Sequence, residues 1–134
     1  MKILIVGGTG LIGSQLKNQL IRKGFSINIL SRIKSKDSNT FLWDINGGYI
    51  DLKAFKGVSG VINLTGANIA GARWTEKRKR TLYDSRILST RLLFKTIKKN
   101  NILIDFFINS SAIGYYGTKT SSKIFKEDNI CGSD

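Results

Sequence analysis

Histidine and proline are absent from this sequence, and cysteine occurs once among its 134 residues. Histidine is the most common general base and the most common metal ligand of proteins, so its absence excludes His-based catalytic triads and zinc sites, and we predict no metal. The single cysteine, Cys131, excludes an internal disulfide, and we expect a reducing, cytoplasmic environment. The absence of proline fits uninterrupted helices and strands and indicates nothing about function.

Long apolar runs are missing as well. No run approaches the roughly 20 residues that a membrane-spanning helix needs, so we expect no membrane partner. The opening stretch MKILIVGG is too short in its apolar part to be the core of a signal peptide. It is better interpreted as a first β-strand.

Acidic residues are scarce: nine Asp and Glu stand against 22 Lys and Arg, which gives a net charge of +13. This balance favours anionic partners such as nucleotides, nucleic acid or acidic membrane surfaces. A solvated, lysine-rich surface is the interpretation we prefer to nucleic-acid binding, because the basic residues are spread along the chain and no usual nucleic-acid motif is present. The densest run, EKRKR at residues 76–80, reads as a solvated first turn of a helix, since adjacent charges point all round a helix.

Apolar runs alternate with helical periodicity along the chain. Short apolar runs predict β-strands at residues 2–6, 25–30, 40–45, 60–66 and 102–110. Helical spacing predicts helices over 11–23 and 75–100 and a short helix near 51–56. The long helix is expected to bury an apolar stripe made of Leu82, Ile87, Leu88, Leu92, Leu93 and Ile97. We therefore predict an α/β fold, a Rossmann-like parallel sheet with strand order 3-2-1-4-5, right-handed crossovers and helices on both faces.

The stretch IVGGTGLIG lies directly between the first predicted strand and the first predicted helix, and it matches the glycine spacing of dinucleotide-binding loops. A pyrophosphate needs backbone N–H groups that it can approach closely and a helix N-terminus that favours negative charge. Gly7 permits the tight turn, Gly10 removes the Cβ that would block the phosphate, and Gly13 lets the helix pack closely on its strand. We predict a dinucleotide site here, with Leu11 and Ile12 between the glycines, rather than a glycine-rich turn without a ligand.

The end of the second predicted strand favours NADP(H) over NAD(H). Dinucleotide folds that bind NAD usually place an acid about 20 residues after the glycines, to hold the ribose 2′-hydroxyl. Here Ser31 and Arg32 occupy that place, and no acid occurs before Asp37. Arg32 can clamp a 2′-phosphate and Ser31 can donate a hydrogen bond to it, while Lys34 and Lys36 add positive potential. The alternative is that these are ordinary loop cations.

Two further strand ends contribute candidate cofactor residues. Asp44 follows the third strand, where it either accepts a hydrogen bond from the adenine amino group or caps a turn. Asn63, Thr65 and Gly66 lie at the C-terminal end of the fourth strand, at the edge where ligands bind in open α/β sheets. Gly66 is expected to leave room for a ribose or nicotinamide ring.

Taken together, GGTGLIG, VINLTGANIAGARWT, SRILSTRLL and SAIGYYG resemble, in order and spacing, the NAD(P)-dependent epimerase/dehydratase family of extended short-chain dehydrogenase/reductases. The likeness is to its atypical, nucleoside-diphosphate-sugar epimerase-like branch and covers essentially the whole chain. It implies a Rossmann fold that binds NADP(H), and redox or epimerase chemistry on a sugar nucleotide or a similar carbonyl or hydroxyl substrate. The cofactor roles it implies fall on Gly7, Gly10, Gly13 and Arg32.

The resemblance also implies a catalytic Ser or Thr at the end of the fifth strand, four residues before the tyrosine of a Tyr-Gly pair. When the family pattern is aligned on Tyr116, that position falls on Ala112, which has no hydroxyl. Ser110 or Ser111 could substitute for it only if the strand end were bulged or shifted. The catalytic candidates are therefore Ser110, Ser111 and Tyr116.

The family's Tyr-x-x-x-Lys pair belongs on a helix that would follow this segment, where the lysine lowers the pKa of the tyrosine for proton transfer. A match to that spacing, Tyr115 to Lys119, falls on a predicted glycine-containing loop. We interpret it as coincidence.

Because full-length relatives continue into that helix, we expect residues 1–134 to be a truncated NAD(P)-binding Rossmann domain without the C-terminal strands and substrate region. We expect it to have weak or no activity alone. Its fifth strand would then be an exposed apolar edge, which predicts self-association or pairing with a separately encoded C-terminal half. Two other functions stay open: a non-catalytic dinucleotide-binding or interaction module, and a basic nucleic-acid binder.

Overall fold

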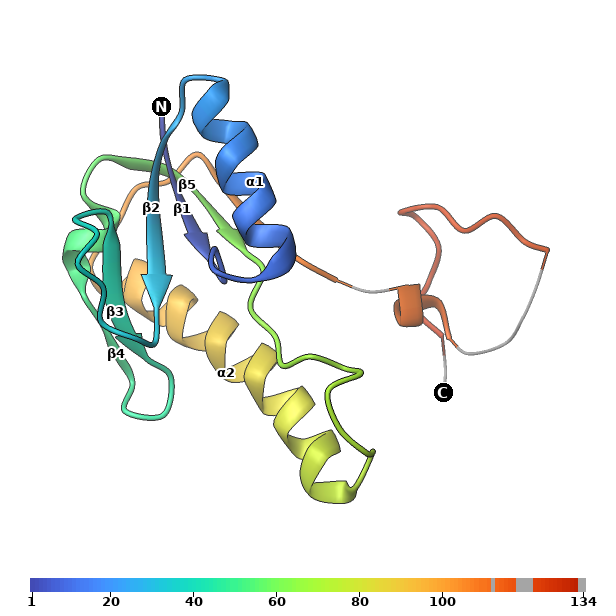
Figure 1. Cartoon of the computed structure of the whole chain (residues 1–134). Coiled ribbons are helices and arrows are strands. Elements are labelled where there is room, and N and C mark those ends of the chain that lie inside the picture. The colour runs from blue at the N-terminus through green and yellow to red at the C-terminus, as the bar shows by residue number, and fades with distance from the viewer. Residues whose placement is uncertain (112, 118–121, 133–134) are drawn as a thin grey trace.

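One mixed, mostly parallel sheet organises the chain in the computed structural model, which describes residues 1–111, 113–117 and 122–132 (Figure 1). Its strands are β1 (Lys2–Val6), β2 (Ser26–Ser31), β3 (Thr40–Asp44), β4 (Tyr49–Ile50), β5 (Val58–Asn63) and β6 (Phe106–Asn109). The helices are α1 (Leu11–Arg22), α2 (Glu76–Lys99) and two short 3₁₀ helices, η1 (Leu52–Phe55) and η2 (Ile113–Tyr116).

The strand order across the sheet is β4-β3-β2-β1-β5-β6. The pairs β1–β2, β1–β5, β2–β3 and β5–β6 are parallel, and β3–β4 is antiparallel. The predicted order 3-2-1-4-5 is therefore confirmed for the five strands that the sequence indicated. Strand β4 was not predicted, because it has only two residues; the Asn46–Gly48 turn before it is its one local signal.

The sheet buries both of its faces, as predicted. Alternate residues of the central strand β1 point to opposite sides, so Leu4 and Val6 belong to one apolar cluster and Ile3 and Ile5 to the other. The first cluster is covered by α2 and η1, and the second is covered by α1. A strand buried on both faces reads as a continuous apolar run, which is why KILIV shows no alternation in the sequence.

The predicted stripe of α2 needs correction. Leu82 and Leu93 are buried, but Leu88 is 38% exposed, and the neighbouring Ser89 is fully buried in its place. Ser89 lies seven residues after Leu82 and four before Leu93, so these three share one face of the helix, and Leu88 is rotated away from it. The Ser89 hydroxyl is satisfied inside the helix by donation to the Arg86 carbonyl at 3.0 Å.

The last predicted strand is shorter than expected, because its first residues complete the end of α2. Asn101 has a left-handed backbone (φ +48°), and the N–H of Ile102 donates to the carbonyl of Ile97 at 3.0 Å. This is the hydrogen bond of a Schellman C-cap, with asparagine in the position that glycine usually takes. Strand β6 therefore begins only at Phe106.

Candidate functional site

The register of the parallel strands brings the predicted cofactor residues to one edge of the sheet (Figure 1). Val6 pairs with Leu30 of β2 and with Asn63 of β5, and Asn63 pairs with Asn109 of β6. The strands therefore end at one level. Four segments leave the sheet there: 7–13, 31–32, 64–66 and 110–111.

The glycine-rich loop has the close contacts that its sequence predicts. Gly7 has φ +83°, and its carbonyl accepts a hydrogen bond from the N–H of Gly10 at 3.1 Å, which closes a tight turn. A Cβ on Gly13 would lie 2.2 Å from the Gly7 carbonyl oxygen and 2.8 Å from the Cα of Gly8. Both atoms belong to backbone, so no other residue fits at position 13 unless the loop moves.

The N-terminus of α1 is open. Gly10 is its N-cap, no side chain caps it, and the first turn has no acid. The N–H groups of a first helical turn have no partner within the helix. Leu11 and Ile12 are 80% and 70% exposed, so the predicted loop residues border this end without covering it. Such a terminus suits an anion.

Ser31 ends β2 at this same edge, and Arg32 follows it. The Ser31 hydroxyl oxygen accepts a hydrogen bond from the N–H of Ile33 at 3.1 Å, and Arg32 is exposed. Asp37 is the nearest acid along the chain, and its carboxylate accepts from the N–H of Asn39 and the hydroxyl of Thr40. The ion pairs found among the described residues do not include Arg32, so its charge is available to a ligand.

Asp44 ends β3 and holds the turn that follows. Its Oδ1 accepts a hydrogen bond from the N–H of Asn46 at 3.0 Å. A Cβ on Gly47 would come within 2.6 Å of Oδ2, so the carboxylate fits closely against a glycine. This is the turn-capping contact that the sequence offered as one alternative; a contact with adenine stays a prediction.

The side chain of Asn63 is buried, although the sequence made it a candidate cofactor residue. It is 2% exposed, and its amide group donates to Oδ1 of Asn109 at 2.7 Å and to Oγ1 of Thr90 at 3.1 Å. Its own Oδ1 accepts from the hydroxyl of Thr65 at 2.6 Å and from its N–H at 3.2 Å. This side chain has no hydrogen-bonding capacity left for a cofactor. It joins β5, β6 and α2 and positions Thr65 at the open edge.

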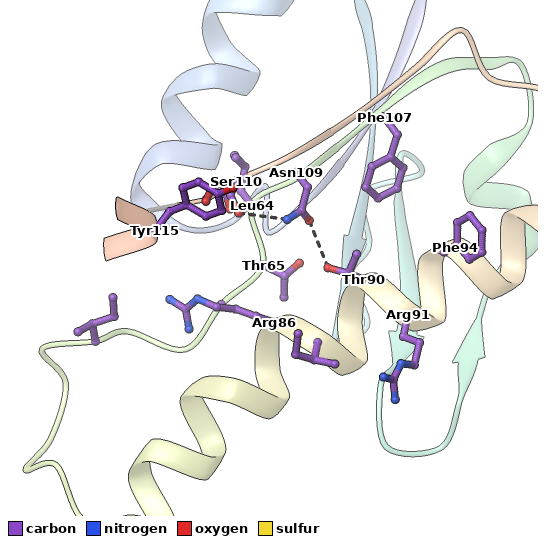
Figure 2. A pocket seen from close by; sticks show the side chains of 14 residues that line it. Leu64, Thr65, Arg86, Thr90, Arg91, Phe94, Phe107, Asn109, Ser110 and Tyr115 are labelled. Carbon is purple, nitrogen blue, oxygen red and sulfur yellow. Dashed lines mark hydrogen bonds between the residues drawn. The ribbon is translucent and has the colours of Figure 1, made fainter. Parts of the chain in front are cut away.

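A pocket of about 1010 Å³ opens beside this edge, between the end of β5, the side of α2 and β6 (Figure 2). It is lined by Leu64, Thr65, Gly66, Ile69, Arg86, Ile87, Thr90, Arg91, Phe94, Phe107, Asn109, Ser110, Ser111 and Tyr115. The guanidinium of Arg86 lies so close to Gly66 that a Cβ there would be 3.0 Å from its Cζ. The space that Gly66 leaves therefore borders on an arginine that sequence reasoning missed.

The catalytic candidates are only partly brought together. Ser110 and Ser111 line the pocket, and so does Tyr115. Tyr116 is not among the lining residues: its hydroxyl donates to the carbonyl of Lys126 at 3.1 Å, and its ring stacks on Phe125 with centroids 4.7 Å apart. Ala112 and Lys119, on which two of our sequence arguments depend, lie outside the described residues.

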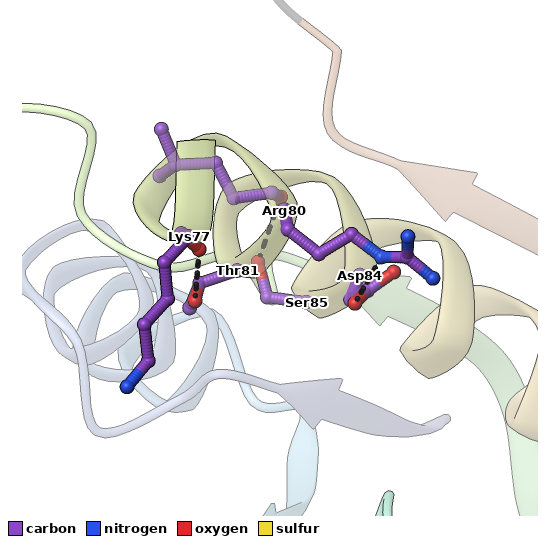
Figure 3. A network of polar contacts seen from close by, with 6 residues as sticks. Lys77, Arg80, Thr81, Asp84 and Ser85 are labelled. Atoms are coloured by element: carbon purple, nitrogen blue, oxygen red, sulfur yellow. Dashed lines mark hydrogen bonds and ion pairs between the residues drawn. The ribbon is translucent and has the colours of Figure 1, made fainter. Parts of the chain in front are cut away.

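The loop over residues 64–75 is tied to α2, which explains part of the ANIAGARWT motif. The hydroxyl of Ser85 accepts from the N–H of Ala67 at 2.9 Å and donates to the carbonyl of Leu82 (Figure 3). Arg78 donates to the carbonyl of Asn68, and the indole of Trp74 donates to the carbonyl of Ile69. The loop beside the pocket is therefore held by Ser85 and Arg78 of α2 and by the indole of its own Trp74.

Across the described ranges, no three acidic, histidine or cysteine residues lie close enough together to hold a metal ion. The described helices include none with the length and hydropathy needed to cross a membrane.

A doubly wound sheet with a glycine-rich loop at its carboxyl edge defines the nucleotide-binding α/β class of proteins. Comparison with known families identifies the family within this class to which the chain belongs. Residues 3–131 match the NAD dependent epimerase/dehydratase family, and the chain belongs to it.

Two curated relatives illustrate the match. An epimerase family protein of Mycobacterium bovis is 34% identical over 131 residues, which are 98% of this chain and 42% of the relative. One of Staphylococcus aureus is 39% identical over 116 residues, which are 84% of this chain and 38% of the relative. The chain thus spans about two fifths of the length of these relatives.

Solved structures show the same fold. A human epimerase family protein, solved with NADPH, has a TM-score of 0.83 and 27% identity, and the match covers 100% of this chain and 44% of the human one. A nucleoside-diphosphate sugar epimerase of Corynebacterium glutamicum has a TM-score of 0.78 and 25% identity over 100% of this chain and 27% of its own. A UDP-glucose 4-epimerase of Bifidobacterium longum, solved with NAD⁺ and UDP, has a TM-score of 0.77 at 21% identity, covering 99% of this chain and 43% of its own. This last likeness concerns the fold alone.

Proposed function

We propose that this chain is the NADP(H)-binding domain of an epimerase- or dehydratase-like oxidoreductase that acts on a sugar nucleotide or a similar carbonyl or hydroxyl substrate. The observation that carries the proposal is the open, uncapped N-terminus of α1 behind the tight loop at Gly7, Gly10 and Gly13. It is supported by the similar human protein, which was solved with NADPH.

The residues of this chain fit a dinucleotide as follows. The pyrophosphate takes the N–H groups at the start of α1, where Gly10 leaves the backbone approachable. Arg32 and Ser31 hold the 2′-phosphate of the adenine ribose, which is the feature that favours NADP(H) over NAD(H). Thr65, fixed by Asn63, borders the nicotinamide end of the edge.

Bound NADP(H) supplies a hydride donor or acceptor. The hydroxyls of Ser110 and Ser111 line the adjoining pocket and can hold a substrate oxygen by hydrogen bonds. The family's Tyr-x-x-x-Lys pair on one helix is not found among the described residues. We therefore expect the chain alone to turn over substrate weakly or not at all.

The test is a pair of calorimetric titrations of the chain with NADPH and NADH. We expect saturable NADPH binding that is about tenfold tighter or more, which corresponds to about 1.4 kcal/mol. Arg32→Asp should remove most of that preference by placing a negative charge against the 2′-phosphate. Lys36→Asp, a matched charge reversal further along the same loop, is the control and should change NADPH affinity much less. A folded chain that binds neither nucleotide would contradict the proposal.

A further inference from the structure

Arg86 presents a fixed positive charge to the pocket. One terminal nitrogen of its guanidinium donates to the carbonyl of Leu82 at 3.0 Å, one turn earlier in α2. The other lies 3.4 Å from the carbonyl of Ala67, and the group packs over Gly66. The side chain is therefore held in place from both the helix and the loop, and both of its partners are neutral.

No carboxylate of the described residues forms an ion pair with Arg86. None of the described residues that line the pocket is acidic, and Arg91 adds a second guanidinium from the same helix (Figure 2). The two ion pairs of the described chain are both on α2 nearer its start: Lys79 with Glu76, and Arg80 with Asp84, the pair drawn in Figure 3. A pre-oriented guanidinium without a counterion matches the geometry of a carboxylate or phosphate group.

The rest of the pocket suits a sugar. Hydroxyl groups of Thr65, Ser110, Ser111 and Tyr115 line it together with the apolar side chains of Ile69 and Phe107. Hydroxyls exchange hydrogen bonds with sugar hydroxyls, and apolar side chains cover the less polar face of a sugar ring. Arg86 shares this wall with the two candidate catalytic serines, so a ligand held by it would reach them.

We propose that Arg86 is a specificity-determining residue that binds an oxyanion of the substrate, either a carboxylate on the sugar or the diphosphate that links the sugar to its nucleoside. The proposal rests on the proposed function and adds to it the chemical group that Arg86 recognises, an oxyanion of an acidic sugar or of a sugar diphosphate. Arg86 acts here as a binding group and takes no part in proton or hydride transfer.

The experiment is a set of titrations of the NADP⁺-loaded chain with UDP-glucuronate and UDP-glucose, which differ by one carboxylate. Arg86→Gln should weaken binding about tenfold or more, because a charged hydrogen bond is lost. Weakening confined to UDP-glucuronate would assign Arg86 to the sugar carboxylate, and equal weakening of both ligands would assign it to the diphosphate. Arg80→Gln, which removes one charge from the same helix outside the pocket, is the matched control.

Three outcomes would overturn the proposal. The wild-type chain could bind neither sugar nucleotide, or Arg86→Gln could weaken binding no more than Arg80→Gln does. Arg86→Gln could also lower the melting temperature or the NADPH affinity while leaving sugar-nucleotide affinity unchanged. Arg86 would then be a residue that stabilises the loop or binds the cofactor. NADPH binding by the wild-type chain, measured separately, reports on the proposed function, so the two failures are distinguishable.

Discussion

At the scale of single residues, the open edge of the sheet depends on positions that accept only one type of amino acid. Gly13 is required because backbone atoms of the preceding loop occupy the space of a side chain. Asn63 is required for the opposite reason, since it fills four hydrogen-bonding positions between three elements. A crowded position and a fully satisfied polar group are both costly to change.

Gly13→Ala should therefore destabilise the chain by about 1–3 kcal/mol, because the new Cβ meets the Gly7 carbonyl oxygen and the loop must move. We also expect NADPH affinity to fall, since we propose that the same loop receives the pyrophosphate. Urea unfolding and calorimetry measure the two effects. Gly114→Ala is the control, because no heavy atom lies within 4 Å of its added Cβ; a similar loss of stability in both variants would contradict the steric explanation.

Asn63→Ala should lower the free energy of unfolding by about 2–3 kcal/mol, because it removes the hydrogen bonds by which a buried amide joins β5 to β6 and α2. Thr65→Val removes one hydroxyl from the same network and should cost about 1 kcal/mol. Chemical denaturation of the two variants compares them directly. An Asn63→Ala variant as stable as the wild type would show that the network does not hold these elements together.

At the scale of elements, β6 is an edge strand that is supported from one side of the sheet only. It has four residues and pairs on one side with β5. The ring of Phe106 covers Gly60 of β5, where a Cβ would lie 2.1 Å from the ring. An aromatic side chain over a strand glycine restores the packing that the glycine lacks, so this pair fastens the edge strand to the sheet.

Phe106→Ala should destabilise β6 by about 3 kcal/mol, in the range measured for the loss of a packed phenylalanine. Hydrogen exchange of the amides of 106–109 should then become faster than exchange in β1. Phe107→Ala is the matched control: Phe107 is 36% exposed and lines the pocket, so its loss should cost less. If the two variants had equal exchange rates in β6, the Phe106–Gly60 contact would not be what fastens the strand.

At the scale of the whole molecule, the outer edge of β6 is the surface that most invites association. No strand pairs with that edge among the described residues, and Ile108 is 53% exposed on it. An apolar edge strand is a template for pairing with a second chain. The positive charge, by contrast, is distributed along the chain. In the basic run at residues 76–80, some side chains already form ion pairs and Arg78 contacts the loop.

We predict that the chain self-associates through β6 at micromolar concentration, and that Ile108→Lys weakens this association by placing a charge on the edge. Sedimentation velocity at several concentrations measures it. Leu103→Lys is the control, since Leu103 is 91% exposed but lies outside the strand. A wild-type chain that sediments as a single monomeric species would contradict the prediction.

Local signals were sufficient for much of the fold. The apolar runs, the helical periodicity and the glycine-rich loop predict the five longer strands, both long helices and the strand order. Each of these depends on neighbours within a few residues, and periodicity records which faces must be buried. The two-residue β4 and the late start of β6 were missed, because a short hairpin and a helix cap alter only a few residues each.

The sequence by itself determined the family, the α/β class and the segment that we propose as the dinucleotide site, because a tight turn before a helix leaves a local glycine pattern. Only the tertiary structure decided how the side chains at the edge are used. Asn63 makes its side-chain hydrogen bonds inside the fold. Arg86 reaches the pocket beside Gly66, and Tyr115 lines that pocket while Tyr116 does not. These outcomes depend on contacts between residues distant in sequence, such as Asn63 with Asn109, 46 positions apart, and Ala67 with Arg86, 19 positions apart, and such pairings leave no periodic trace in one chain.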